Sequence, residues 1–298
     1  MRLNDGIEIT LDPIFNETCT FISFKSEEKY LGSIPEITIQ LKSNKDLVKV
    51  LDEITGKITQ GGNSIDFKAY VYSTSFSNNT NIIKLLCCDS KFTREVQLSK
   101  FTSMSDILSS CYSLGVTKNC DSSVSGVDLY QKSESNHAFL SRMLLAYKQD
   151  AIFGYTVGGL RIHDLTNYKS EVEYQHKADI SPITDNQLTD PKLFSDEVEV
   201  LEEYTNHVLL KYNSAIVQLN KEYETLVSNY IHNQRYIYNT RGDYQFSLKY
   251  IPKISLTDGI TIKTSETTMR EYFVTSRMIS IDASSCVTSI GLGALNPI

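Results

Sequence analysis

Apolar and polar residues alternate along much of the first hundred positions, a pattern typical of β-strands with one buried face. Four segments show this alternation: Gly6–Leu11, Cys19–Phe24, Ile34–Leu41 and Phe67–Phe76. The last of them, FKAYVYSTSF, is also rich in the aromatic and β-branched residues that favour strands. The N-terminal third is therefore predicted to form a β-sheet.

Other segments in this third depart from the alternation. Apolar residues at helical spacing occupy positions Leu47, Val50, Leu51 and Ile54. Because Gly56 follows them, we expect a short helix that ends at this glycine. The run GGN at 61–63 predicts a turn, and NIIKLLCCDS at 81–90 predicts a strand with both faces buried.

After residue 100 the periodicity changes from strand to helix. In the segment 102–115 an apolar stripe contains Ile107 and Leu108, and Gly115 is placed to end a helix. A second helix is predicted over 135–149, with Arg142 and Lys148 expected to face water. Its apolar stripe is formed by Phe139, Leu140, Met143, Leu144 and Tyr147. We expect both stripes to pack the helices against neighbouring elements.

Strand patterns surround the second helix. One predicted strand, Gly126–Gln131, precedes it, and two others, Ala151–Val157 and Leu160–Asp164, follow it. Between the latter two, Gly158 and Gly159 give the two-residue signal of a hairpin turn that requires positive φ. Together with the helix at 102–115, these elements predict a small α/β insert.

The remainder of the chain predicts a return to β-structure. Residues 166–195 are polar and contain two prolines, which is typical of a long connection. The region 196–239 leaves a heptad seam and strands as open alternatives. Alternation then returns in Tyr244–Tyr250, Gly259–Thr264, Glu271–Ile281 and Cys286–Leu292. The predicted fold class is therefore mainly β with a small α/β insert.

Composition and charge narrow the class of protein. The 298 residues include 29 basic and 36 acidic side chains, giving a formal net charge of -7. This balance argues against a protein whose main role is to bind the nucleic-acid backbone. No apolar run approaches the roughly 20 residues of a membrane helix, and the first residues lack the pattern of a signal peptide. We therefore expect a protein that does not insert into membranes by itself.

No arrangement of residues predicts catalysis, a metal or a cofactor. The six cysteines form no C-x-x-C pair, so we expect reduced and mostly buried thiols. The five histidines are dispersed, and His163 and its neighbour Asp164 would face opposite ways on a strand. The chain also has no phosphate loop, G-x-S-x-G, H-E-x-x-H or dinucleotide motif. We expect no catalytic residue, no bound metal and no cofactor.

Five segments, taken in order, carry a resemblance to a known family. They are FKAYVYSTSFSNNTNIIKLLCCDS (67–90), FTREVQLSKFTSMSDILSS (92–110), YQKSESNHAFLSRMLLAYKQDAIFGYTVGGLRIHDL (130–165), IPKISLTDGITIKT (251–264) and EYFVTSRMISI (271–281). Their order and spacing resemble the central hub proteins of phage baseplates and the hub portion of type VI secretion spike proteins. The match is loose over 196–239.

This resemblance implies an architecture and an assembly. It implies a first tube-like β-barrel domain over 1–100, an α/β insert domain over 101–165, and a long connection with a second tube-like barrel over 166–298. Three such chains would form a trimeric baseplate hub that adapts the six-fold tail tube ring to a three-fold central spike. The chain ends at residue 298 without the spike segment of some members, so we expect the spike to be a separate protein.

The resemblance also implies a place and a path for DNA. The hub would belong to the virion, in the phage tail baseplate beside other baseplate proteins, after synthesis in the cytoplasm of a bacterial host. Its channel would let DNA pass during ejection, and fixed basic residues there would hold the phosphates back. Acidic residues on alternating strands, such as Glu8, Asp66 and Glu271, are candidates for the channel lining. Solvation of the outer surface is the alternative role for each.

A second functional class stays open from the residues. A β-rich tail protein that binds a host receptor or glycan would have the same strand patterns. The 18 tyrosines are compatible with a sugar-binding surface, but tyrosine is also a common strand residue. The chain has no tryptophan to stack on sugar rings. The hub interpretation is therefore preferred.

Overall fold

The computed structural model describes most of the chain, and its described part is dominated by β-strands. The described residues are 2–3, 6–14, 19–30, 33–88, 90–101, 129–147, 151–164, 172–175, 181–185, 198–203, 207–212, 215–220, 229, 232–233, 244–263 and 269–294. They contain the strands β1 to β19 and the helix α2. The predicted mainly β fold class is confirmed.

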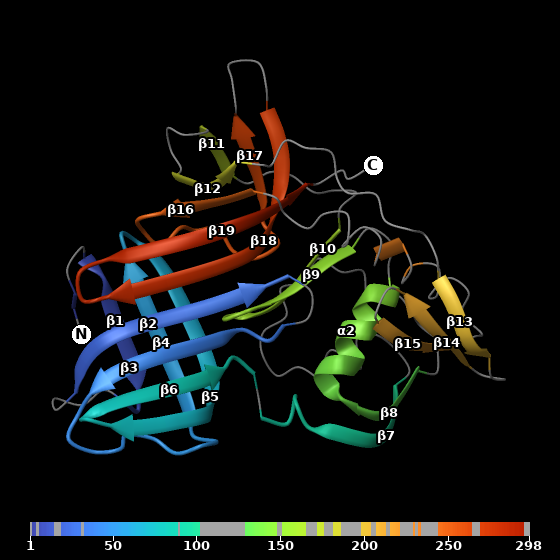
Figure 1. The fold of residues 1–298 in the computed structure, drawn as a ribbon, viewed down its shortest axis with the longest axis horizontal. Coiled ribbons are helices and arrows are strands. Elements are labelled where there is room, and N and C mark those ends of the chain that lie inside the picture. The colour runs from blue at the N-terminus through green and yellow to red at the C-terminus, as the bar shows by residue number, and fades with distance from the viewer. Residues whose placement is uncertain are drawn as a thin grey trace.

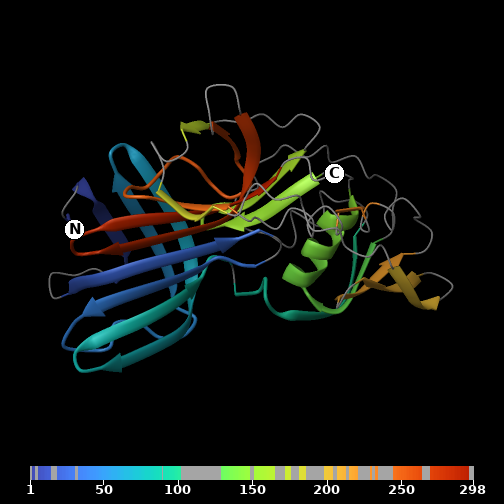
Figure 2. The same cartoon turned by 45° about the horizontal axis from the view of Figure 1, so that its top comes forward.

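The N-terminal strands form a sheet that curls around its apolar face. They are β1 (Glu8–Asp12), β2 (Thr20–Lys29), β3 (Glu36–Lys42), β4 (Glu53–Gln60), β5 (Asn63–Ser77) and β6 (Thr80–Leu86). Their order is β1-β4-β5-β6-β3-β2, and every pair is antiparallel. In β1, Ile9 and Leu11 are buried while Glu8 and Thr10 are exposed. Figures 1 and 2 show β2, β3 and β6 crossing over β1, β4 and β5.

The C-terminal strands continue this sheet. They are β12 (Ser181–Asp185), β16 (Tyr244–Leu248), β17 (Gly259–Lys263), β18 (Met269–Asp282) and β19 (Cys286–Ala294). β18 pairs antiparallel with β2, and the sheet then runs on through β19, β16 and β12. β17 pairs with β18 and, in parallel, with β11 (Val172–Gln175). The first and last thirds of the chain thus share one 12-stranded sheet.

The long sheet carries two hydrophobic cores. One contains the inward residues of β1 to β6 together with Ile279, Ile281 and Cys286 from β18 and β19. The other is built from C-terminal strands and includes Phe246 and Ile290. Since the first core takes side chains from β18 and β19, the N-terminal strands do not complete their core alone.

The insert lies between the two groups of strands in the chain. Its described elements are β7 (Glu95–Phe101), β8 (Leu129–Ser135), α2 (Asn136–Tyr147), β9 (Ala151–Thr156) and β10 (Gly159–Asp164). β7 pairs with β8, so it lies with the insert although it precedes the expected boundary at residue 101. In both views the β9–β10 hairpin lies between the large sheet and α2 (Figures 1 and 2). The predicted helix over 102–115 lies outside the described residues.

Where it is described, the region with open alternatives forms strands in its first part, whereas Asn229, His232 and Asn233 are helical. A three-stranded sheet contains β13 (Val198–Glu203), β14 (His207–Tyr212) and β15 (Ala215–Asn220). Ile216 and Leu219, two positions of the possible heptad seam, lie on β15. The expected connection 166–195 contains β11 and β12, which both join the large sheet. Of the described residues, no helix is both long enough and apolar enough to cross a membrane.

The expected helix that ends at Gly56 is wrong, because Ile54 and Gly56 lie inside strand β4. Gly56 pairs directly with Phe67 on β5. A Cβ atom at Gly56 would lie 2.1 Å from the Phe67 ring, so the glycine makes room for this ring in the core. The same glycine that suggested a helix end therefore has a packing role in a strand.

Replacement of Gly56 by alanine is expected to displace the Phe67 ring. We predict a loss of about 1 to 3 kcal/mol in the free energy of unfolding, as for other overpacked cores. Urea denaturation would measure it, with Gly61→Ala as a comparison in a turn where a Cβ meets nothing within 4 Å but φ is +57°. An unchanged stability in Gly56→Ala would contradict the packing role.

The turn between β18 and β19 is held by a carboxylate. Asp282 Oδ1 accepts hydrogen bonds from the main-chain N–H groups of Ser284 and Ser285, and both serine hydroxyls donate to the same side chain. These hydrogen bonds, above all the one from the Ser284 N–H, lower the Asp282 pKa from its ordinary value of 3.8 to about 2. Because the folded pKa lies below the unfolded one, the carboxylate stabilises the fold above pH 3.8 and this contribution disappears as the pH falls through about 2.

We therefore predict that Asp282 titrates with a midpoint near pH 2, as followed by the NMR shifts of the Ser284 and Ser285 amides. Asp282→Asn is expected to remove the pH dependence in this range, because asparagine does not ionise. A midpoint at the ordinary value of 3.8 would show that the turn does not hold the carboxylate.

Candidate functional site

The tip of the β9–β10 hairpin meets the large sheet at the point where its two halves join. Gly154 on β9 forms an isolated bridge with Tyr30, just beyond the end of β2. A Cβ atom at Gly154 would lie 2.4 Å from Leu256 Cδ2, so a larger residue here would displace the Leu256 side chain. Val157, at the tip, is buried in the first hydrophobic core. The insert thus contributes a side chain to the core of the sheet.

A buried ion pair connects the two halves of the sheet at this point. Glu28 on β2 and Arg277 on β18 lie directly opposite each other. Arg277 Nε donates to Glu28 Oε2 at 2.7 Å and Arg277 Nη2 donates to Glu28 Oε1 at 2.8 Å. The side chains of arginine and glutamate are only 8% and 1% exposed. The geometry is bidentate, which is the strongest arrangement for such a pair.

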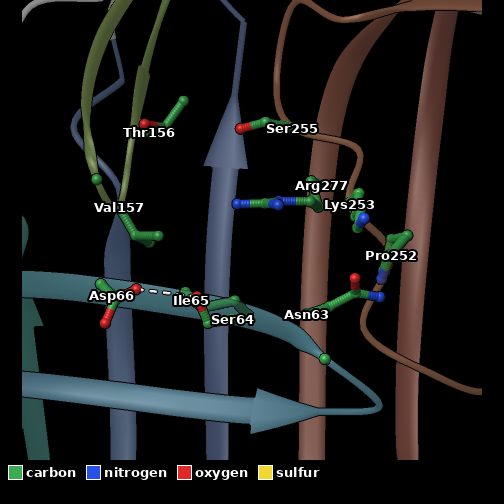
Figure 3. A pocket seen from close by; sticks show the side chains of 12 residues that line it. Asn63, Ser64, Ile65, Asp66, Thr156, Val157, Pro252, Lys253, Ser255 and Arg277 are labelled. Carbon is green, nitrogen blue, oxygen red and sulfur yellow. Dashed lines mark hydrogen bonds between the residues drawn. The ribbon is translucent and has the colours of Figure 1, made fainter. Parts of the chain in front are cut away.

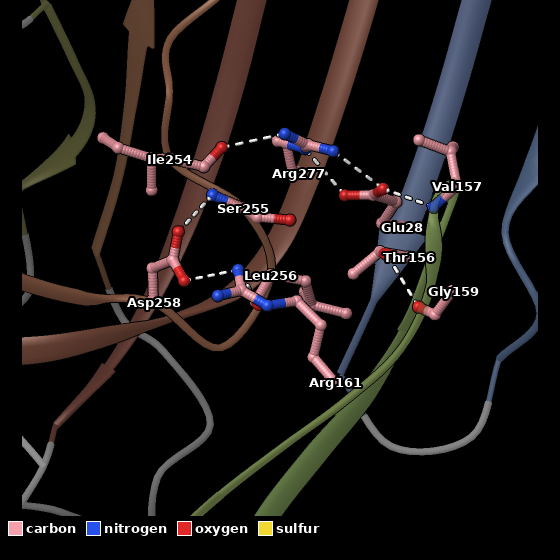
Figure 4. A network of polar contacts seen from close by, with 10 residues as sticks. All are labelled: Glu28, Thr156, Val157, Gly159, Arg161, Ile254, Ser255, Leu256, Asp258 and Arg277. Atoms are coloured by element: carbon pink, nitrogen blue, oxygen red, sulfur yellow. Dashed lines mark hydrogen bonds and ion pairs between the residues drawn. The ribbon is translucent and has the colours of Figure 1, made fainter. Parts of the chain in front are cut away.

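The same pair also binds main-chain groups of two other segments (Figure 4). Val157 N donates to Glu28 Oε1 at 2.8 Å, and Arg277 Nη1 donates to the carbonyl oxygen of Ile254 at 2.8 Å. The Thr156 hydroxyl donates to the carbonyl oxygen of Gly159 at 2.6 Å and closes the turn. One ion pair therefore joins β2, β18, the hairpin and the segment before β17.

A second ion pair holds the side of the hairpin. Arg161 on β10 pairs with Asp258, and its guanidinium also donates to the carbonyl oxygen of Leu256 at 3.4 Å. Asp258 Oδ2 in turn accepts a hydrogen bond from Ser255 N at 2.6 Å. Within this turn Thr257 has a φ of 70°, and its N–H donates to the carbonyl oxygen of Val274 at 2.9 Å. The turn before β17 is thus attached to both β18 and the hairpin.

A shallow polar pocket of about 400 Å³ opens beside the first ion pair (Figure 3). Its walls come from the β4–β5 turn, the hairpin tip and the segment 252–255, and Arg277 points into it. The charge of this guanidinium is balanced by Glu28. Among the described residues, no group of three or more histidine, cysteine or acidic side chains could hold a metal ion.

The thiol of Cys87, which is influenced by the charge of Glu28, is a poor nucleophile. Burial raises the pKa of the Cys87 thiol well above its usual value, and the negative charge of Glu28 raises it further. Because of this raised pKa, Cys87 stays protonated, and a protonated thiol is not the reactive form. The four described cysteines, Cys19, Cys87, Cys88 and Cys286, form no disulfide with one another. What the junction can do chemically is to hold four segments in fixed positions.

The residues singled out from the sequence lie mostly in the insert. The stripe of α2 is buried: Phe139 and Leu140 are 0% exposed, Met143 is 3% and Leu144 is 2%. Ile107 and Leu108 lie outside the described residues. The hairpin turn is placed one residue earlier than expected, because Thr156 pairs with Gly159 and leaves Val157 and Gly158 at the tip. Arg142 is only 17% exposed and pairs with Glu134, although it was expected to face water.

The three candidate lining residues are exposed but are not brought together. Glu8 and Asp66 lie on the outward face of the N-terminal strands, where each has a cationic neighbour, Arg2 and Lys57. Glu271 lies on β18 opposite Thr261, in the C-terminal part of the sheet. The outward face around Glu8 and Asp66 is therefore a surface of paired charges.

Sequence reasoning missed the two ion pairs of the junction. Glu28 falls in phase with Phe24 and Ser26 on the buried face of β2, and Arg277 falls in phase with Ile279 and Ile281 on β18. A charged residue at a buried position of a strand pattern needs a partner of opposite charge. The sequence shows that Glu28 and Arg277 occupy buried positions of strand patterns, but it does not show that they are partners.

Comparisons with known proteins place this architecture. The sequence matches no known family model and no curated protein. Among solved structures, it is similar to the 43 kDa tail protein of prophage MuSo2 from Shewanella oneidensis, with a TM-score of 0.59, 10% identity and coverage of 97% of this chain and 98% of that one. A tail protein from Neisseria meningitidis gives a TM-score of 0.57 and 7% identity over 97% and 96% of the two chains.

A third similar structure comes from a secretion system. The E. coli c3393 protein, described as a component of the type VI secretion system with structural similarity to the T4 bacteriophage tail proteins gp27 and gp5, has a TM-score of 0.59 and 9% identity. The similarity covers 96% of this chain and 76% of that one. At such low identities the likeness concerns the fold, and the chain has the fold of phage tail proteins and of a type VI secretion component.

Proposed function

We propose that the chain is a structural protein of a phage tail, the baseplate hub. The observation that carries this proposal is the similarity to tail proteins over nearly the full length of both chains, insert included. The described polar junction supports it further, because its charged groups are used to join segments. A protein whose segments are joined in this way is suited to a structural role in an assembly.

The proposed assembly is a trimer. Each chain has two hydrophobic cores on one sheet, so three chains would bring six cores into one ring. Such a ring would match a six-fold tail tube on one side and a three-fold central spike on the other. Its proposed partners are the tail tube ring, a spike protein and other baseplate proteins, and its place is the virion.

Mass photometry and negative-stain imaging of the purified protein would test this assembly. We expect trimeric rings with a central hole, which bind separately purified tube protein. A glycan array on the same sample covers the receptor-binding alternative. A monomer that binds a specific sugar and forms no ring with tube protein would overturn the hub and favour the receptor-binding protein.

We further propose that the channel is not basic, so that DNA passes during ejection without being held. Glu8, Asp66 and Glu271 remain the candidates for its lining. Fixed lysine or arginine side chains would bind phosphates and release counterions, which strengthens retention. A reconstruction of the ring with its surface potential would test this, and a channel lined mainly by lysine and arginine would contradict it.

No enzymatic activity is part of the proposed function. We predict that the purified protein contains no stoichiometric transition metal and does not hydrolyse peptidoglycan, peptides or nucleic acid. Inductively coupled plasma mass spectrometry and turnover assays would measure both properties. Hydrolysis that disappears on replacement of one acidic residue would refute the prediction.

A further inference from the structure

The β9–β10 hairpin contacts the large sheet at its tip through Val157, and along its side through Gly154 and Arg161. Among the described residues, main-chain pairing of the hairpin with the sheet is limited to the bridge between Gly154 and Tyr30. By contrast, β2 and β18 pair along seven residues of each strand, from Ser276 with Lys29 to Asp282 with Ser23. Main-chain pairing therefore holds the hairpin to the sheet much less than it holds β2 to β18.

The Glu28 carboxylate contributes to both attachments. Its Oε1 atom accepts a hydrogen bond from Arg277 Nη2 and another from Val157 N, each at 2.8 Å. The Val157 N–H is at the tip of the hairpin, where the Val157 side chain enters the first core. With the carboxylate removed, this buried N–H has lost its acceptor, and an unpaired buried donor disfavours the docked position.

We propose that Glu28 is a latch that locks the hairpin, and with it the insert, in one orientation relative to both halves of the sheet. Arg277 orients the carboxylate by its bidentate contact, and Arg277 Nη1 is itself held by the carbonyl oxygen of Ile254. The tight turn closed by Thr156 and Gly159 presents the Val157 N–H as a rigid donor. Without the latch, the tip leaves the sheet while the sheet itself stays folded.

This inference goes beyond the hub proposal, since it concerns motion within one chain. The second contact, between Arg161 and Asp258, lies on the side of the hairpin and does not hold the Val157 N–H. We therefore expect loss of the latch to affect the tip first, at residues 156 to 159. The part of β9 next to the tip stays attached to α2, because the Tyr155 hydroxyl lies 3.0 Å from the Ser141 hydroxyl.

Hydrogen exchange measured by mass spectrometry on the full chain tests the latch. Glu28→Gln keeps one acceptor oxygen but loses the charge and the second acceptor that Arg277 uses, so amides of the hairpin are expected to exchange about tenfold faster, the scale of a hydrogen bond to a charged group. Amides of β3 and β6 report on the sheet. Glu27→Gln is the matched control, because Glu27 is the next residue on the same strand but faces outward and pairs with Lys29. We expect it to leave the hairpin unchanged.

The double variant Glu28→Leu with Arg277→Met separates the latch from the ion pair. Apolar residues of similar size avoid an unpaired buried charge, so the sheet is expected to keep its protection. The Val157 N–H still lacks an acceptor, so the hairpin is expected to exchange about tenfold faster. Wild-type protection of the hairpin in this variant would overturn the proposal. Unfolding of the variant, or equal acceleration in the hairpin and in β3 and β6, would also overturn it.

Discussion

Replacement of Arg277 by methionine is expected to lower the free energy of unfolding by about 3 to 5 kcal/mol, the scale for removing one partner of a buried ion pair. The variant leaves the Glu28 carboxylate, 1% exposed, without its cation. It also removes the donor to the carbonyl oxygen of Ile254. Glu28 and Ile254 are both buried, so each is left with a buried polar group that has lost its partner. Urea denaturation followed by circular dichroism would measure the loss.

Lys29→Met is the matched control for this prediction. Lys29 is on the same strand as Glu28, but its side chain is 60% exposed and pairs with Glu27 on the surface. Such pairs contribute about 0 to 1 kcal/mol, so we expect a small change. Similar losses for Arg277→Met and Lys29→Met would show that the buried pair has no special weight.

Leu140→Ala is expected to cost about 2 to 5 kcal/mol, as other leucine truncations in protein cores do. Leu140 lies in α2 and is 0% exposed. Alanine at this position leaves a cavity between the helix and the elements that cover it. Leu51→Ala makes the same chemical change at a leucine that is 59% exposed, so it should alter the stability by no more than about 0.5 kcal/mol. Denaturant titration of both variants would decide whether the α2 stripe is core.

Arg142→Ala gives a further comparison on the same helix. Its guanidinium pairs with Glu134 and lies 5.1 Å from the centre of the Phe139 ring. We therefore expect a loss between those of Leu51→Ala and Leu140→Ala. A loss as small as that of Leu51→Ala would show that the contacts of Arg142 with Glu134 and Phe139 contribute little to stability.

The local elements were largely predictable because their patterns are periodic. Tyr244–Leu248 and Gly259–Lys263 fall within segments where alternation predicted strands. The helical spacing of Leu47, Val50, Leu51 and Ile54 misled, because Ile54 belongs to β4 and Leu51 adopts a φ of 76° in the preceding loop. Four apolar residues do not distinguish a short helix from a loop followed by a strand.

The arrangement of the strands and the junction could not be predicted in the same way. Alternation shows which face of a strand is buried but not which strand is its neighbour. The pairing of β2 with β18 joins segments from opposite ends of the chain. Glu28 and Arg277 have a partner only because of that pairing, so their roles follow from the topology.

The shared sheet sets an order on biosynthesis. Arg277 is separated from Glu28 by 249 positions in the sequence, and Ile279, Ile281 and Cys286 complete the core of the first strands. While a ribosome is still adding the last residues, the N-terminal strands have an open edge at β2 and an unfilled core. Contacts over such long separations form slowly, and exposed strand edges favour aggregation. The β2 edge therefore stays exposed until β18 has been synthesised.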